Sequence, residues 1–236
     1  LPVVGLSGAG KSSFVQAGVI PRLRERGPLV VLQVRPGHRP FVTLAHRIVA
    51  ARRQASGSLG MSVFGVSART GAPAASHETD RGEADWLAEQ LQSAPHLLNL
   101  VLQRLADRRE SSVLLFVDQL EELVTLEPDE AVREAFMQAV CAAADDPQGH
   151  VRVVLTVREE FLSRLAGHDG VRQALSQIKV LQSPGREALQ EIVSRPLAVT
   201  GFEFDDPSLV HRMVDEVQGE IACLPLLQFA GQMLWD

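Results

Sequence analysis

The chain has 236 residues, a mass of 25.7 kDa and a formal net charge of −6. This length suits one large α/β domain with a small helical unit and argues against two full-sized domains. Hydrophobic residues at 45% and charged residues at 22% exclude a disordered or a fibrous chain. The acidic balance makes duplex DNA and an anionic membrane surface poor candidates for partners.

No apolar run reaches the ~20 residues that a membrane-spanning helix needs. The two cysteines, Cys141 and Cys223, lack the spacing of a disulfide framework or a zinc knuckle, and the seven histidines are scattered without metal-ligand spacing. The sequence therefore predicts a soluble protein of the reducing cytoplasm. Because the chain opens on an apolar segment without methionine, we expect it to be a piece of a longer polypeptide.

Short apolar runs alternate with stretches of helical periodicity, which is the pattern of βαβ units around a parallel sheet. Five runs predict strands that are covered on both faces: Pro2–Gly5, Leu29–Val34, Val113–Val117, Val151–Val157 and Ile178–Leu181. The expected helices between them are Lys11–Leu23, Phe41–Ala51, Trp86–Leu105, Asp129–Ala144 and a short Phe161–Ala166. The fold class predicted is a three-layer α/β/α protein.

The composition of the chain changes at two places. Residues 54–84 are rich in Gly, Ser, Ala, Thr and Pro, which predicts a loop-like insertion within a core of residues 1–183. Strand patterns end after Pro184, and the periodicity then predicts three helices, Arg186–Leu197, Pro207–Val217 and Leu224–Trp235. Residues 184–236 are therefore expected to form a small helical lid, truncated at the end of this piece.

The strongest motif lies between the first predicted strand and helix, where Gly5 to Ser12 match G-x-x-x-x-G-K-[ST]. Glycines let backbone N–H groups converge on a β-phosphate, the helix N-terminus adds its positive dipole end, and the Lys11 ammonium bridges phosphate oxygens. The same residues do not match the nucleophile elbow G-x-S-x-G, because Ala9 stands where that motif requires its last glycine. The motif predicts a P-loop for a nucleotide, with these nucleotide-binding residues: Gly5, Ser7, Gly8, Ala9, Gly10, Lys11, Ser12 and Ser13.

A P-loop needs an acid at the tip of a neighbouring strand, and the third predicted strand runs into Asp118. We expect Asp118 and the Ser12 hydroxyl to hold Mg²⁺. Glu121 and Glu122 follow, and one of them can orient or deprotonate the attacking water, with Glu121 as first choice and Glu122 as second. The alternative is that these acids only favour a helix N-terminus. Gln119 stands where many P-loop ATPases carry the glutamate.

The fourth predicted strand ends at Arg158, beside the crevice of a parallel sheet, where a guanidinium can reach a γ-phosphate. The alternative is a surface salt bridge with Glu159 or Glu160. Arg35, after the second strand, is better explained as part of a structural loop. Pro225 suits the first turn of a lid helix.

These motifs together resemble the STAND class of signalling P-loop NTPases, and most closely its bacterial novel STAND group. Leu120 replaces the usual Phe of the group's V-D-Q-F-E-E-L motif, and Gly219 lies too far before Pro225 for a strict G-x-P. The resemblance extends over nearly the whole chain, through Val4–Ser13 with Ala17–Pro21, Arg35–Gly37, Val117–Leu123, Leu155–Leu162 and Leu224–Leu227.

The resemblance implies a five-stranded sheet in the order 5-1-4-3-2, ATP and Mg²⁺ as ligands, Arg158 as a sensor and Pro225 against the adenine. It also implies effector and repeat-type sensor domains outside this piece, and a nucleotide-dependent homo-oligomer. The expected function is an ATP-binding, slowly hydrolysing signalling switch. The alternatives are a nucleotide-dependent scaffold with little hydrolysis and an AAA+-like DNA-loading motor, against which the acidic balance counts.

Overall fold

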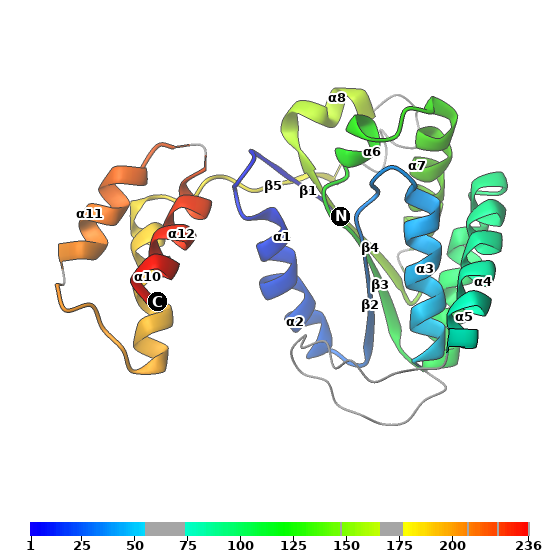
Figure 1. Ribbon diagram of the computed structural model, residues 1–236, viewed down its shortest axis with the longest axis horizontal. Helices are drawn as coiled ribbons and strands as arrows, with labels where there is room; N and C mark the ends of the chain where they lie inside the picture. The colour runs from blue at the N-terminus through cyan, green and yellow to red at the C-terminus, as the bar shows by residue number, and fades with distance from the viewer. Residues whose placement is uncertain (55–73, 147, 166–176, 207, 221, 236) are drawn as a thin grey trace.

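The computed structural model describes residues 1–54, 74–146, 148–165, 177–206, 208–220 and 222–235. Its centre is a five-stranded sheet in the order β2-β3-β4-β1-β5, in which every described strand pair is parallel (Figure 1). The strands are β1 (Pro2–Gly5), β2 (Leu29–Val34), β3 (Ser112–Val117), β4 (Val151–Arg158) and β5 (Lys179–Val180). Read from the β5 edge, this order is 5-1-4-3-2, which confirms the predicted P-loop topology.

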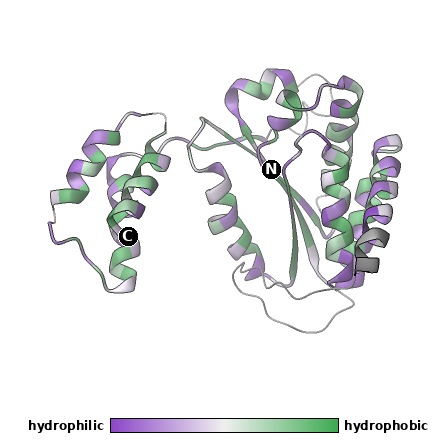
Figure 2. Cartoon of the chain, in the orientation of Figure 1, coloured by the Kyte–Doolittle hydropathy of each residue, from purple (hydrophilic) through white to green (hydrophobic). Residues whose placement is uncertain are grey.

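Alternate residues of the central strands pack on opposite faces of the sheet. Val113, Leu115 and Val117 of β3 belong to the larger core cluster, whereas Leu114 and Phe116 belong to a smaller one on the other face. All five side chains are fully buried, which explains why this strand carries no polar alternation. Figure 2 shows the matching hydrophobic stripes on the helices. The helices of the larger cluster include α3 (Pro40–Arg53), α4 (Ala74–Ser93), α5 (Leu97–Arg109) and α7 (Glu130–Ala144).

Among the described residues, the helical segment that covers the smaller face begins at Lys11, as the sequence predicts. It comprises α1 (Lys11–Ser13), a π-helical stretch η1 (Phe14–Val19) and α2 (Ile20–Arg24). Val15 and Ile20 anchor this segment against the sheet. The segment starts directly after the glycine-rich turn, so its unpaired backbone N–H groups lie at the C-terminal end of β1.

The prediction of a single helix over Trp86–Leu105 is wrong, because two helices occupy this region. Helix α4 begins already at Ala74, inside the segment expected to be a loop, and the chain breaks before α5 begins at Leu97. Pro95 lies in the break, where its missing N–H and its ring prevent a continuous helix. The remainder of the predicted insertion, residues 55–73, lies outside the described residues.

Three helices follow the sheet at the predicted places: α10 (Arg186–Thr200), α11 (Ser208–Val217) and α12 (Cys223–Trp235). They form a small core of their own from Leu189, Val214, Cys223 and Leu227, and lie to one side of the sheet in Figure 1. Helix α10 runs to Thr200 rather than Leu197 and ends at Gly201, whose φ of +78° gives a left-handed C-cap.

The remaining differences from the predicted elements are small. Strand β4 includes Arg158, and β5 is shorter than predicted. The expected helix Phe161–Ala166 is a 3₁₀ turn, η2 (Glu159–Phe161), followed by α8 (Leu162–Leu165), while residue 166 lies outside the described part. Among the helices that the structure describes, none combines the length and the apolar character that crossing a bilayer requires.

Candidate nucleotide-binding site

The turn between β1 and α1 needs its three motif glycines for separate reasons. Gly8 and Gly10 have φ values of +76° and +80°, a left-handed conformation that side chains disfavour. A Cβ atom on Gly5 would lie 2.5 Å from the carbonyl oxygen of Leu181, which follows β5. The close approach of the neighbouring chain therefore excludes a side chain at Gly5. The turn has the backbone form of a loop that can wrap a phosphate.

Lys11 lies at the mouth of this turn. Its Nζ donates hydrogen bonds to the backbone oxygens of Gly5, at 2.9 Å, and Leu6, at 2.7 Å. Burial lowers the pKa of Lys11, the nearby Glu121 carboxylate acts against this shift, and the Arg158 guanidinium adds to it. The ammonium is thus held among the predicted site residues, where phosphate oxygens would be stronger acceptors than neutral carbonyls.

Asp118 joins the P-loop to the neighbouring strands. Its Oδ1 accepts a hydrogen bond from the Ser12 hydroxyl at 2.5 Å and another from the Thr156 hydroxyl at 2.7 Å. The Asp118 side chain is fully buried, and Thr156 Oγ1 in turn accepts from the backbone N–H of Gln119 at 2.9 Å. The two predicted metal-side residues, separated by most of the core sequence, are therefore in direct contact.

The donor set at this position suits Mg²⁺, which prefers carboxylate, hydroxyl and water oxygens. No group of three or more His, Cys, Asp or Glu side chains that could hold a metal occurs within the described ranges. Ser12 and Asp118 would offer such a metal one hydroxyl and one carboxylate ligand.

Glu121 and Arg158, both predicted to act in catalysis, contact each other. The chain turns sharply after Asp118 at Gln119, whose φ is +56°, and this turn brings Glu121 to the end of β4. Glu121 Oε1 lies 3.2 Å from Arg158 Nε, and its Oε2 accepts the backbone N–H of Arg158 at 3.3 Å. The Glu121 side chain is 9% exposed, whereas that of Arg158 is 43% exposed.

These contacts bear on two alternatives left open by the sequence: a surface salt bridge between Arg158 and Glu160, and Glu122 in place of Glu121 as the base. Arg158 does meet Glu160, but its Nη1 lies 3.9 Å from that carboxylate, farther than the contact with Glu121. Glu122 lies in the first turn of α6 (Glu122–Thr125) and is half-buried. The surface pair with Glu160 is therefore the weaker of the two contacts that Arg158 makes.

The C-terminal helices approach the P-loop through Leu224. The Cδ1 atom of Leu224, in the first turn of α12, lies 3.0 Å from the position that a Cβ atom on Gly10 would occupy. Pro225 is the next residue in the same turn and is exposed. The contact between Pro225 and the adenine stays a prediction.

Sequence reasoning missed two residues of this site. Thr156 is 1% exposed and binds the Asp118 carboxylate, and the signal for it was a hydroxyl within an otherwise apolar strand, two residues before Arg158. Arg35 was assigned to a structural loop, yet its Nε and Nη2 lie 3.4 Å and 3.3 Å from Asp118 Oδ2. No local sequence pattern identifies this second contact, because it depends on how β2 and β3 are aligned.

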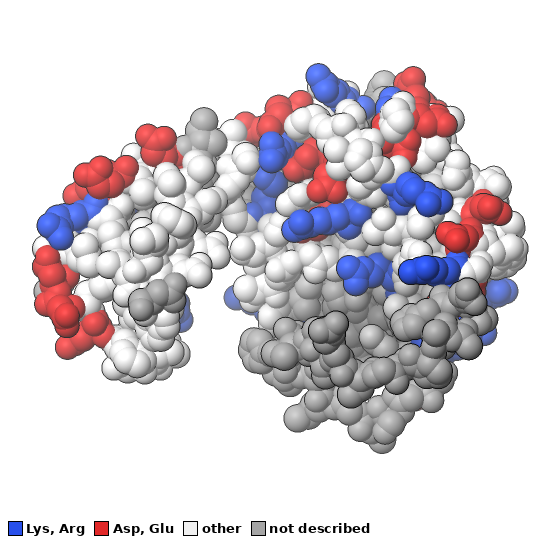
Figure 3. All heavy atoms as spheres, viewed as in Figure 1, with Lys and Arg blue, Asp and Glu red and all other residues white. Residues whose placement is uncertain are grey.

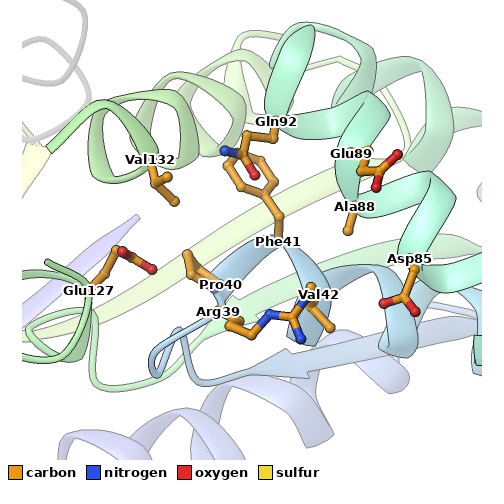
Figure 4. A pocket seen from close by; sticks show the side chains of 10 residues that line it. All are labelled: Arg39, Pro40, Phe41, Val42, Asp85, Ala88, Glu89, Gln92, Glu127 and Val132. Carbon is orange, nitrogen blue, oxygen red and sulfur yellow. The ribbon is translucent and has the colours of Figure 1, made fainter. Parts of the chain in front are cut away.

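A cavity of about 440 Å³ lies apart from these residues, at the start of α3 (Figure 4). Figure 4 shows Arg39 and Phe41 on one side, Asp85 and Glu89 of α4 on another, and Glu127 near α7. None of the predicted nucleotide-site residues lines it. The chemistry argued above therefore belongs to the P-loop edge of the sheet and not to this cavity.

Replacing Asp118 with asparagine is expected to weaken nucleotide binding in Mg²⁺ more than in a chelator, because the carboxylate acts through the metal and its waters. Titration of ATP with and without Mg²⁺ measures the difference. The affinity that remains in chelator should come from the loop and Lys11. Equal losses under both conditions would show that Asp118 is not the acid on the metal side.

Among solved structures, the Orc1 protein of Aeropyrum pernix in complex with DNA is similar to this chain, with a TM-score of 0.54 and 16% sequence identity. The match covers 98% of this chain and 53% of the Orc1 chain, so the chain spans about half the length of that protein. At this identity the likeness establishes the fold alone. The comparison with curated proteins gave no match. The family profile nSTAND1, described as Novel STAND NTPase 1, matches residues 1–236, and the chain therefore belongs to the novel STAND NTPase 1 family.

Proposed function

We propose that this chain is the ATP-binding and slowly hydrolysing switch module of a larger signalling protein. The observation that carries the proposal is the 2.5 Å hydrogen bond from Ser12 to Asp118, which joins the P-loop to the acid of a neighbouring strand. Membership of a STAND NTPase family supports the same conclusion. ATP is the nucleotide proposed, and Ser12 and Asp118 would hold the Mg²⁺ that accompanies it.

Binding needs few rearrangements in this geometry. The Lys11 ammonium exchanges its bonds to the Gly5 and Leu6 oxygens for phosphate oxygens, which are charged and therefore stronger acceptors. Backbone N–H groups at the start of α1 would be available to donate to the same phosphates. Bound Mg²⁺ would supply neutralisation of the phosphate charge. The protein contributes position and electrostatics, which is the main requirement of phosphoryl transfer.

Hydrolysis requires a carboxylate that is free to orient water, and Glu121 is the proposed base. Its two carboxylate oxygens are paired with Arg158, so while that pair is intact they are not free to orient water. A γ-phosphate competes for the same guanidinium, because a charge-assisted contact to phosphate suits arginine well. The ion pair therefore supports a slow reaction. It also supports a base, Glu121, that is freed from Arg158 only when ATP is bound.

Replacing Arg158 with alanine is expected to lower the preference for ATP over ADP by about tenfold, roughly 1.4 kcal/mol, because only ATP offers the γ-phosphate. ADP affinity should barely change. Paired calorimetric titrations with the two nucleotides measure this difference. Arg152, exposed on the same strand, is the matched control, and its replacement by alanine should affect neither affinity. Equal losses for ATP and ADP would instead give Arg158 a structural role.

The partners of the module are part of the proposal. We infer effector and sensor domains elsewhere in the protein, and an ATP-dependent homo-oligomer that light scattering on the protein carrying this chain would detect. Nucleic acid is a poor partner, although the Orc1 structure contains DNA. The net charge is −6, and acidic and basic side chains are interspersed on the core face that Figure 3 shows. We place the module in the cytoplasm, where ATP and Mg²⁺ are available.

The second candidate function is a nucleotide-dependent scaffold that hardly turns over. The Glu121–Arg158 ion pair favours it, because a base that never leaves its partner cannot assist water. Both functions predict nucleotide binding at Lys11. They differ in whether bound ATP becomes ADP, which a time course on loaded protein measures.

A further inference from the structure

Arg35 and Asp118 occupy equivalent positions on neighbouring strands. Val34 of β2 pairs with Val117 of β3, so the residues that follow them emerge side by side at the edge that carries the P-loop. The backbone N–H of Asp118 also donates to the carbonyl of Val34 at 2.8 Å. Strand pairing thus fixes the two positions relative to each other.

The two oxygens of the Asp118 carboxylate have different partners. Oδ1 accepts from the hydroxyls of Ser12 and Thr156. Oδ2 is contacted, among the described residues, only by the Arg35 guanidinium, with Nη2 at 3.3 Å and Nε at 3.4 Å. A fully buried carboxylate is costly unless its charge is compensated, and among the described residues Arg35 is the cation that forms an ion pair with it.

The two partners differ in their freedom to move. The Asp118 side chain is 0% exposed, whereas that of Arg35 is 55% exposed. Arg35 can therefore become hydrated when it leaves this contact, whereas the cost of an unpaired charge falls on the buried Asp118 until another cation replaces Arg35. Asp118 is buried and cannot turn out into solvent, so its carboxylate pairs with either Arg35 or another cation at the same position.

We infer that Arg35 is a further positioning residue of the nucleotide site, and that its guanidinium competes with hydrated Mg²⁺ for Oδ2 of Asp118. This inference rests on the proposed nucleotide function. Arg35 holds the buried carboxylate in place before the metal arrives and gives it up when Mg²⁺ and nucleotide bind together. Arg35 thereby sets the Mg²⁺ concentration at which the site loads, since two cations share one carboxylate oxygen.

The β2–α3 connection offers a matched control. Arg39 belongs to the same connection but lines the separate cavity of Figure 4, away from the P-loop. Replacing either arginine with glutamine removes one positive charge from the connection. Only the change at Arg35 removes the competitor of the metal. A general effect of net charge would therefore appear equally in both variants.

The test is the Mg²⁺ concentration needed for half-maximal Mg²⁺-dependent ATP binding, followed by calorimetry or with a fluorescent ATP analogue. Arg35→Gln is expected to lower this concentration about fivefold, because the half-exposed guanidinium is a weak competitor that water can partly replace. Arg39→Gln should leave it unchanged. Arg35→Lys, which keeps a cation at this position, should stay within about twofold of the wild type.

An unchanged or raised Mg²⁺ requirement in Arg35→Gln would overturn the inference, as would an equal shift in Arg39→Gln. If Arg35→Gln does not fold, Arg35→Lys carries the test. A Mg²⁺ requirement of Arg35→Lys far above that of the wild type would contradict simple competition. Failure of the wild-type chain to bind ATP at any Mg²⁺ concentration would instead contradict the proposed nucleotide function.

Discussion

Replacing Lys11 with alanine is expected to abolish tight nucleotide binding. The variant keeps the neutral backbone turn but loses the ammonium that lies at its mouth. Losing a charge-assisted contact to phosphate should reduce ATP affinity by about 100-fold or more. Calorimetric titration with ATP and Mg²⁺ measures the loss directly.

The sequence offers a matched control, because Lys11 and Lys179 are its only lysines. Lys179 lies in the exposed edge strand β5, so Lys179→Ala removes the same charge without touching the P-loop. It should bind ATP as the wild type does. Unchanged ATP affinity in Lys11→Ala would refute the assignment of this turn as a P-loop.

Replacing Glu121 with glutamine should leave ATP affinity nearly intact and lower turnover by about 10²-fold or more. Glutamine keeps the shape of the side chain and one of its two acceptor oxygens, but it carries no charge and cannot accept a proton from water. The variant should therefore hold ATP without converting it. Turnover is measured as phosphate release, and the nucleotide bound is identified after removing the free excess.

Glu122→Gln is the control for this experiment, because it removes the adjacent carboxylate from the first turn of α6. If Glu122→Gln carries the loss and Glu121→Gln does not, Glu122 is the base. If neither variant slows the reaction, the scaffold function gains support. The unfolding midpoint should move little in Glu121→Gln, since Arg158 is 43% exposed and water can replace its lost ion-pair partner.

The strands of this fold could be predicted because burial on both faces leaves a continuous apolar run, as in Val113–Val117. The sheet order came from the family resemblance rather than from periodicity. Helix α4 could not be predicted in the same way, because its N-terminal part is polar and Gly-containing and begins within a segment of loop-like composition. The break at Pro95 was hidden by apolar periodicity that continues on both sides of it.

The P-loop itself could be predicted because its chemistry lies in eight consecutive residues. The contacts around Asp118 could not, since they depend on strand register: Val34 pairs with Val117, which in turn pairs with Leu155. That register places Arg35 and Thr156 beside Asp118 from strands distant in sequence. The Glu121–Arg158 pair arises in the same way, after the left-handed turn at Gln119.

The central claim is that the chain binds ATP and converts it slowly in place. The most direct measurement loads the wild-type chain with ATP and Mg²⁺, removes free nucleotide, and follows the bound ATP and ADP over time. The account predicts about one nucleotide per chain, a slow conversion of ATP to ADP, and no loading of Lys11→Ala. A wild-type chain that retains no nucleotide, or that retains ATP unchanged throughout, would contradict it.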